Sequence, residues 1–201
     1  MSFHKDFEVK KIDAIDGVDC YSVSGTPSDC VKYGVTNYDK KFDLVVSGIN
    51  GGPNLGSDIF YSGTVNACFE ANVENIPAIA FSNVALKDYN YQENGKVISK
   101  IFDTLCRMAS GSFVLNVNMP NLPLNDIKGV KVCPAGTCKY TDGYIKTAEN
   151  VYRLIGEPIA PTEADFGTDI YYVYQNYVTV SPLKPQVNDS SIVETLKDIK
   201  F

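Results

Sequence analysis

The sequence predicts an α/β fold of the Rossmann-like class, with a mainly parallel sheet, flanking helices and a C-terminal β-hairpin extension. Short apolar segments alternate with helical patterns through the first 125 residues. This rhythm is typical of parallel strands joined by right-handed helical crossovers. Beyond residue 126 the chain becomes rich in tyrosine and turn residues, which favours a hairpin. We therefore expect a core over 1–125 and an oligomerisation extension over 126–201.

The predicted strands are short and apolar. In chain order they are 7–12, 20–23, 44–46, 79–81, 113–117, 130–132 and 177–180, with a longer strand-like stretch at 144–155. The run Leu44-Val45-Val46 is continuously apolar, as expected for a strand that is buried on both faces. The stretch 144–155 cannot bury both of its faces alone, so we expect it to pack against another subunit.

The predicted helices are located by caps and by apolar spacing. Thr26 is a suitable N-cap, with Pro27 at the first helical position and Asp29 as an acidic capping partner. Gly34 is expected to end this helix or to fray its last turn. The other predicted helices are 64–74, a segment with apolar residues at helical spacing over 97–105, and a C-terminal helix that starts at Ser190.

Composition limits the function. The 18 lysines and arginines are outnumbered by 24 aspartates and glutamates. A nucleic-acid duplex is therefore not an expected partner, since neutralising its phosphates needs clustered cations. No stretch approaches the roughly 18 apolar residues of a membrane span, and the first residues lack the apolar middle of a signal peptide. Four of the six cysteines stand singly in apolar stretches, which is typical of a reducing compartment. We expect a cytoplasmic protein without a membrane partner.

The loop that follows residue 46 is where we expect the functional site, because ligands bind outside the carboxyl ends of parallel strands. Asn50 comes directly off a strand, and its amide oxygen is a neutral, hard ligand suited to Mg²⁺, Mn²⁺ or Ca²⁺. The alternative is that Asn50 only caps a turn.

A second candidate element, Ser62-Gly63-Thr64, precedes a predicted helix. Glycine allows close approach of the backbone, the hydroxyls add donors, and the helix N-terminus favours an anion such as phosphate. The alternative is an N-cap that binds nothing. The loop matches neither the Walker nor the dinucleotide fingerprint, which disfavours a dinucleotide-binding module. An oxygen ligand that precedes an anion cradle indicates metal-assisted phosphate chemistry.

The run VSGINGGPNLGSDIFYSGTV at 46–65 resembles the signature of the SurE family, the survival-protein nucleotidases and phosphatases. The segments GTPSDCV at 25–31, IPAIA at 76–80 and LNVN at 115–118 support the resemblance, which covers nearly the whole chain. It implies a phosphomonoesterase that depends on a divalent metal, Mg²⁺ or Mn²⁺, and acts on nucleoside monophosphates. It also implies a homodimer or homotetramer formed through the C-terminal hairpin.

The same resemblance implies roles for individual residues. Asn50 matches the metal-binding asparagine of the family, and Asn54, Ser62 and Thr64 match residues that line its phosphate pocket, with Gly63 between the last two. No catalytic residue is assigned.

One family segment is not matched. The family opens with a strand that ends in Asn-Asp-Asp-Gly, whose aspartates bind the metal, and this sequence has no such segment. We therefore expect an N-terminally incomplete copy that lacks the first strands of the family fold. Two hypotheses follow: a nucleotidase whose acidic ligands lie upstream, or a catalytically inactive remnant that only oligomerises or binds phosphate.

Overall fold

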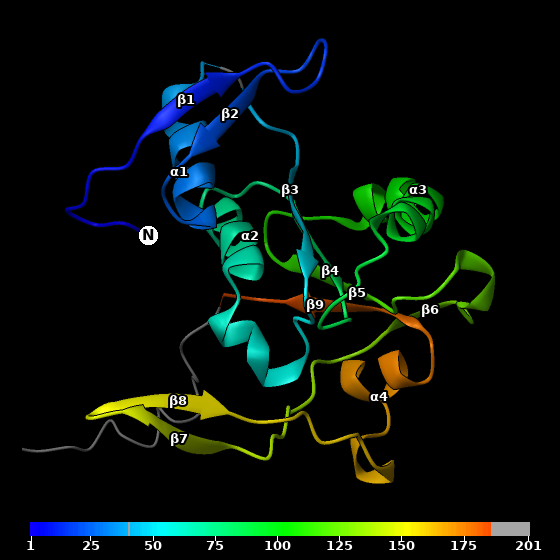
Figure 1. Ribbon diagram of the computed structural model, residues 1–201. Helices are drawn as coiled ribbons and strands as arrows, with labels where there is room; N and C mark the ends of the chain where they lie inside the picture. Colours follow the sequence, from blue (N-terminus) through cyan, green and yellow to red (C-terminus); the bar gives the residue numbers. More distant parts are fainter. Residues whose placement is uncertain (40, 186–201) are drawn as a thin grey trace, which may run out of the picture.

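A central five-stranded sheet organises the computed structural model, which describes residues 1–39 and 41–185 (Figure 1). In spatial order its strands are β3 (Val45–Gly51), β4 (Ala78–Asn83), β5 (Val114–Met119), β9 (Val178–Leu183) and β6 (Val130–Val132). The strands β3, β4 and β5 are parallel, β9 is antiparallel to β5, and β6 is parallel to β9. The predicted α/β fold with a mainly parallel sheet is confirmed, and the sheet takes strands from both sides of residue 125.

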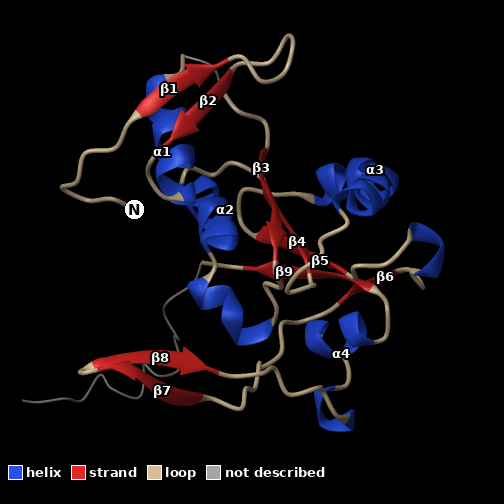
Figure 2. Ribbon diagram, in the orientation of Figure 1, coloured by secondary structure: helices blue, strands red, loops and turns tan. Residues whose placement is uncertain are grey.

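Helices cover both faces of this sheet (Figure 2). α2 (Gly63–Val73) and α3 (Tyr91–Met108) pack on opposite faces, α4 (Asp169–Tyr174) packs against β9 and β5, and α1 (Pro27–Asn37) packs on α2. Successive side chains of a strand point to opposite faces, and β4 shows this directly. Its Ala78 and Ala80 pack in one apolar cluster with α2, whereas Ile79 and Phe81 pack in another with α3. Burial on both faces explains why β4 is apolar along most of its length.

The strand β3 differs from its prediction. In the described part of the chain it pairs with β4 alone and forms one edge of the sheet. Val46 is 48% exposed, so the expected burial of this strand on both faces is wrong. A continuous apolar run shows that a segment suits a buried strand, but it does not show how many neighbours the strand finds.

The N-terminal part forms a small layer of its own. β1 (Val9–Ile12) and β2 (Cys20–Val23) pair as an antiparallel hairpin beside α1 (Figure 1). The predicted capping box is confirmed, because Thr26 accepts a hydrogen bond from the backbone N–H of Asp29 while the Asp29 carboxylate accepts one from that of Thr26. Of the two expectations for Gly34, an end at this residue is wrong, since α1 continues to Asn37 and Gly34 lies in its last turn. A single glycine inside a helix costs only about 1 kcal/mol, which the surrounding packing tolerates.

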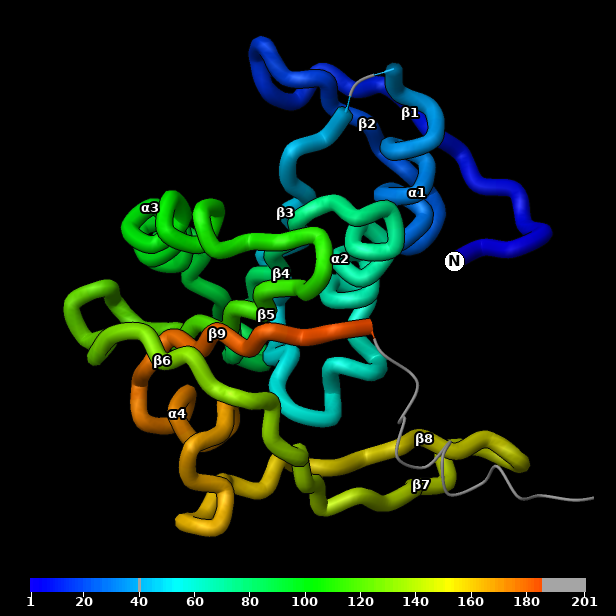
Figure 3. Tube along the Cα trace, turned by 180° about the vertical axis from the view of Figure 1, so that it is seen from behind, coloured from blue at the N-terminus to red at the C-terminus, as the bar shows by residue number. Residues whose placement is uncertain are grey.

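The remaining described elements are short 3-10 helices and a second hairpin. They are the 3-10 helices η1 (Gly56–Tyr61), η2 (Leu124–Asp126) and η3 (Glu163–Asp165) and the hairpin of β7 (Gly143–Ala148) and β8 (Val151–Ile155). The hairpin stands apart from the sheet in both views (Figures 1 and 3). The short helix α4 was not predicted, and the helix predicted from Ser190 lies outside the described residues. Among the helices of the described part, we find none with the length and apolarity needed to cross a bilayer.

Candidate functional site

The first predicted site residue, Asn50, lies near the end of β3. It is half-buried, it is paired in register with Ser82 of β4, and its side-chain amide donates to the carbonyl oxygen of Gly52 at 3.0 Å. That hydrogen bond supports the turn-capping alternative. The same hydrogen bond fixes the orientation of the amide group. Its Oδ1 oxygen accepts no hydrogen bond from residues 1–39 or 41–185, so this oxygen is available to a ligand. Turn capping and ligand binding are therefore compatible in this residue.

The second predicted residue, Asn54, is held tightly by the sheet and is only 5% exposed. Its backbone N–H donates to Oδ1 of Asn118 at 2.9 Å, and its carbonyl oxygen accepts from the amides of Asn116 and Asn118 at 2.8 and 3.0 Å. Its own side-chain amide donates to Ser82 Oγ at 2.6 Å. The Asn54 side chain thus points to the sheet, and Ser82 connects it to the strand position opposite Asn50.

The third element is the start of α2. Ser62 is the N-cap, and its hydroxyl accepts a hydrogen bond from the Val65 N–H at 3.1 Å. Gly63 and Thr64 are the first two helical residues, whose N–H groups have no partner inside the helix. A methyl group on Gly63 would approach Pro27 of α1 to 3.3 Å, so the starts of the two helices lie side by side. The capping role of Ser62 is thus present, and the free N–H groups beyond it suit an anion.

Asp169, to which the sequence analysis assigned no role, connects the loop of Asn54 to the C-terminal part of the fold. Its carboxylate is fully buried and accepts backbone N–H groups from Gly56, Gly136 and Ile170 at 2.9, 2.8 and 2.8 Å. Burial raises the pKa of Asp169, and the three N–H donors oppose that rise. The carboxylate joins the loop that carries Asn54 to a segment eighty residues further along the chain.

A second such connection joins η1 to residues 137–140. The Tyr140 hydroxyl donates to the carboxylate of Asp58, and the Cys138 N–H donates to Ser57 Oγ at 3.0 Å. Burial, followed by the hydrogen bond to Asp58, raises the pKa of Tyr140. Burial and nearby Asp58 raise the pKa of Cys138 to about 12. Cys138 is therefore a neutral thiol at physiological pH and not a nucleophile.

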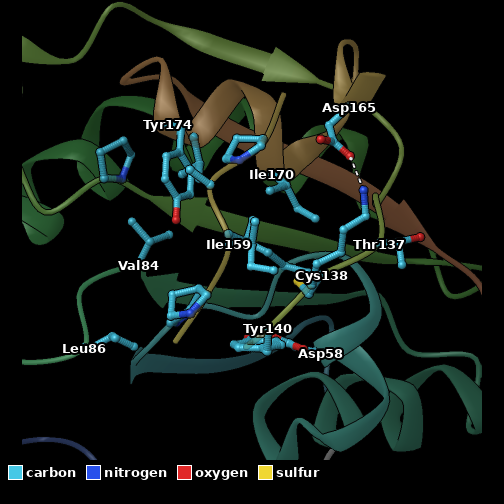
Figure 4. A pocket seen from close by; sticks show the side chains of 18 of the residues that line it. Asp58, Val84, Leu86, Thr137, Cys138, Tyr140, Ile159, Asp165, Ile170 and Tyr174 are labelled. Atoms are coloured by element: carbon cyan, nitrogen blue, oxygen red, sulfur yellow. Dashed lines mark hydrogen bonds and ion pairs between the residues drawn. The ribbon is translucent and has the colours of Figure 1, made fainter. Parts of the chain in front are cut away.

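A pocket of about 420 Å³ lies where these segments meet (Figure 4). Its walls include Pro53 after β3, Val84 after β4 and Pro120 after β5. The pocket therefore sits over the carboxyl ends of three neighbouring parallel strands, the place where open α/β sheets bind ligands. Its lining does not include Asn50 or Ser62 to Thr64.

A metal ion needs more ligands than this region supplies. The amide oxygen of Asn50 suits a hard divalent cation as one ligand. Within residues 1–39 and 41–185, however, no group of three or more histidines, cysteines, aspartates or glutamates is placed to hold an ion. A neutral oxygen alone lacks the negative charge that a tight Mg²⁺ or Mn²⁺ site needs, so the described residues do not by themselves form a metal site.

Comparison with known proteins decides the family. The profile of the family described as "Survival protein SurE" matches residues 1–142. The chain belongs to the SurE family. This confirms the resemblance on which the site residues were chosen, although it does not test their individual roles.

Relatives match along almost the whole chain. The protein named 5'-nucleotidase SurE from Clostridium beijerinckii is 39% identical over 99% of this chain and 81% of its own length. That of Natranaerobius thermophilus is 38% identical over 96% of this chain and 77% of its own. The crystal structure of the SurE protein from Aquifex aeolicus superposes with a TM-score of 0.85 at 36% identity, over 98% of this chain and 81% of that one. The fold and the family are thus established by independent comparisons.

Proposed function

We propose that this chain is a 5'-nucleotidase, a phosphomonoesterase that hydrolyses nucleoside monophosphates. The observation that carries the proposal is the connection from β3 to α2. The helix α2 leads from β3 to the parallel strand β4. Its N-terminus is therefore on the side of the sheet where the carboxyl ends of the strands lie, and Asn50 is near that end of β3. The amide oxygen of Asn50 and the N-terminus of α2, which suits an anion, therefore both lie at the carboxyl ends of the strands, where ligands bind. The relatives named 5'-nucleotidase SurE support removal of phosphate from a nucleotide as the reaction.

The residues of this chain would act on the phosphoryl group mainly by binding it. The N–H groups of Gly63 and Thr64 and the positive end of the α2 dipole would stabilise the charge that develops as the ester bond breaks. Asn54 would hold the loop in place through its contacts with the sheet, since its side chain is occupied by Ser82. We take Mg²⁺ or Mn²⁺ as the cofactor, with Asn50 as one ligand. Such a cation supplies a Lewis acid for the phosphoryl oxygens.

The test is release of inorganic phosphate from a nucleoside 5'-monophosphate, with Mg²⁺ or Mn²⁺ present and then removed by a chelator. We expect release that depends on the metal. If the chain binds phosphate and forms oligomers but releases none at any metal concentration, the inactive-remnant hypothesis is correct. The cytoplasm stays the proposed compartment, on the argument from isolated cysteines.

Replacing Thr64 by valine should weaken phosphate binding. Valine keeps the shape of threonine but removes the hydroxyl donor at the start of α2. Loss of one hydrogen bond to a charged group is expected to raise the inhibition constant of inorganic phosphate about tenfold. The midpoint of thermal unfolding should not change. Thr36→Val on the exposed end of α1 is the matched control, because its hydroxyl bonds only to its own helix. An unchanged constant would leave Thr64 without a role in the phosphate site.

We also propose that the hairpin of β7 and β8 joins subunits into a homodimer or homotetramer. Tyr144 and Leu154 face each other across its two strands and are 72% and 58% exposed. A two-stranded ribbon is at best marginally stable alone, so these apolar side chains need a partner surface.

Placing aspartate at both Tyr144 and Leu154 should therefore convert the oligomer to monomer, because two charges would have to be buried in the interface. Sedimentation velocity measures the change. Met108→Asp, which alters an exposed apolar residue at the end of α3, should leave the oligomer intact. A double variant that sediments as the parent protein does would show that the hairpin is not the interface.

A further inference from the structure

We propose that a pocket between β2 and α1 binds a small quaternary ammonium compound. This pocket is separate from the residues proposed to act on the phosphoryl group, since none of Asn50, Asn54 or residues 62–64 lines it. Three features support the proposal: the arrangement of aromatic rings, a carboxylate in the lining, and a helical glycine that leaves the space open.

The walls of this pocket include aromatic rings that stand at steep angles to one another. Tyr21 comes from β2, whereas Tyr38 and Phe42 follow the end of α1. The ring centroids of Tyr21 and Tyr38 are 5.6 Å apart at an interplanar angle of 77°, and those of Tyr38 and Phe42 are 6.4 Å apart at 69°. Tyr33 of α1 adds a further ring to the lining. Neighbouring rings that are nearly perpendicular form the corner of a box, an arrangement in which aromatic faces can surround a cation.

The pocket is open to solvent and has room for a small ligand. Its volume is about 330 Å³, which lies in the range of small-molecule sites. Tyr21 is 37% exposed and Phe42 is 40% exposed, so water covers part of both rings. A ligand that carries methyl groups would bury this aromatic surface, which is favourable.

The charge of the pocket favours a cation. Among the described residues that line it, Asp19 is the one carboxylate, and none is a lysine or an arginine. Asp19 already holds an ammonium group, since Lys11 Nζ donates to its carboxylate at 2.8 Å. The two side chains are 61% and 60% exposed, and an exposed ion pair of this kind contributes little to stability. A cation from solution can therefore replace the Lys11 ammonium beside Asp19.

The aromatic faces select the kind of cation. A quaternary ammonium has no N–H group that needs an acceptor, and the electron-rich faces of aromatic rings attract it. A primary ammonium such as that of lysine is strongly hydrated and loses more on entering the pocket. The lining therefore suits a methylated ammonium better than a primary amine.

Gly34 of α1 leaves the pocket open. Apart from its own helix and among the described residues, a methyl group at this position would meet only Phe42 Cζ, at 4.0 Å. The φ angle of Gly34 lies outside the left-handed region, so neither close packing nor the backbone requires a glycine here. A glycine inside a helix is destabilising relative to alanine. Because Gly34 and Phe42 both line the pocket, what this glycine provides is space for a ligand.

The experiment compares binding of choline with binding of 3,3-dimethyl-1-butanol, an uncharged compound of the same shape, by isothermal titration calorimetry on the full chain. We expect choline to bind about tenfold more tightly, because only the cation is attracted by the ring faces and by Asp19. Gly34→Leu should abolish choline binding by filling the pocket. It should not lower the midpoint of thermal unfolding, since leucine favours a helix more than glycine does. The matched control is Gly95→Leu, at a glycine of α3 with open space around it, which should bind choline as the parent protein does.

A second set of variants tests the exchange at Asp19. Lys11→Met removes the ammonium that competes for this carboxylate, so choline should bind about two to five times more tightly, the range for an exposed ion pair. Lys10→Met removes a similar exposed pair with Glu8 and should not change the affinity for choline. Asp19→Asn should weaken choline binding about fivefold and leave binding of the uncharged compound unaffected.

Two results would overturn the ammonium site. Equal binding of choline and 3,3-dimethyl-1-butanol would show that the pocket is only an apolar crevice. Choline binding that persists in Gly34→Leu would show that the cation binds elsewhere on this acidic protein. Neither measurement depends on phosphate release, so the ammonium site is tested separately from the nucleotidase proposal.

Discussion

In a chain that also carries the family's Asn-Asp-Asp-Gly segment, replacing Asn50 by alanine is expected to weaken Mn²⁺ binding by at least about tenfold and to lower metal-dependent phosphate release by about 100-fold. The reason lies in the orientation of this side chain. Its amide nitrogen is held by the Gly52 carbonyl oxygen, so its oxygen is the end left for a ligand. A hard cation prefers an oxygen of this kind, and alanine offers none.

Two measurements separate loss of a ligand from loss of the fold. Calorimetric titration with Mn²⁺ reports the ligand directly, without requiring turnover, and thermal unfolding reports the fold. Asn50 is half-buried on an edge strand, so the midpoint of thermal unfolding of Asn50→Ala should differ little from that of the parent protein. Asn37→Ala, an exposed asparagine at the end of α1, is the matched control and should change neither quantity. Mn²⁺ affinity that is equal in Asn50→Ala and Asn37→Ala would leave Asn50 as a turn cap only.

The parts of the fold that depend on neighbouring residues were predictable. The capping box of Thr26 and Asp29 needs only a three-residue spacing, and the crossover from β3 to α2 needs only the order of the elements. The edge position of β3 was not predictable, because an apolar run does not show which strands lie beside it. An end of α1 at Gly34 was wrong for a related reason, since tertiary contacts outweigh the local preference of one glycine.

The candidate site likewise contains residues that could be predicted from the sequence and residues that could not. Asn50 and the start of α2 could be chosen from chemistry that is local in sequence. Asn116 and Asn118 could not be assigned a role, although polar residues at alternate positions of a buried strand were a visible signal. Their partner, Asn54, lies more than sixty residues away. A buried amide on a strand needs a hydrogen-bonding partner, but sequence alone does not identify that partner.

Asp169 is the extreme case, because its partner Gly56 is 113 residues away. Asp169→Ala is expected to lower the free energy of unfolding by about 3 to 5 kcal/mol, since three buried N–H groups would lose their acceptor together. Asp169→Asn should cost less, about 1 to 3 kcal/mol, because one oxygen can still accept the N–H groups of Gly136 and Ile170 while the amide faces that of Gly56. Denaturant unfolding measures both. Asp126→Ala, an exposed aspartate in η2, is the control and should stay within about 0.5 kcal/mol of the parent.

The pH dependence of the stability of Asp169→Asn and the parent protein tests the direction in which the pKa of Asp169 is shifted. Because burial raises the pKa of Asp169, the folded protein retains this proton at a pH where the unfolded chain has released it. The contribution of this group to stability is therefore largest below its unfolded pKa of about 3.9, and it declines as the pH rises through the folded pKa. The neutral side chain of Asp169→Asn shows no such decline, so the stability gap between parent and variant should narrow as the pH rises above about 4. A gap that widens instead would mean that the three N–H donors outweigh burial and hold the pKa of this carboxyl below its ordinary value. In that case the charge on Asp169 would itself stabilise the connection between the Asn54 loop and the rest of the site.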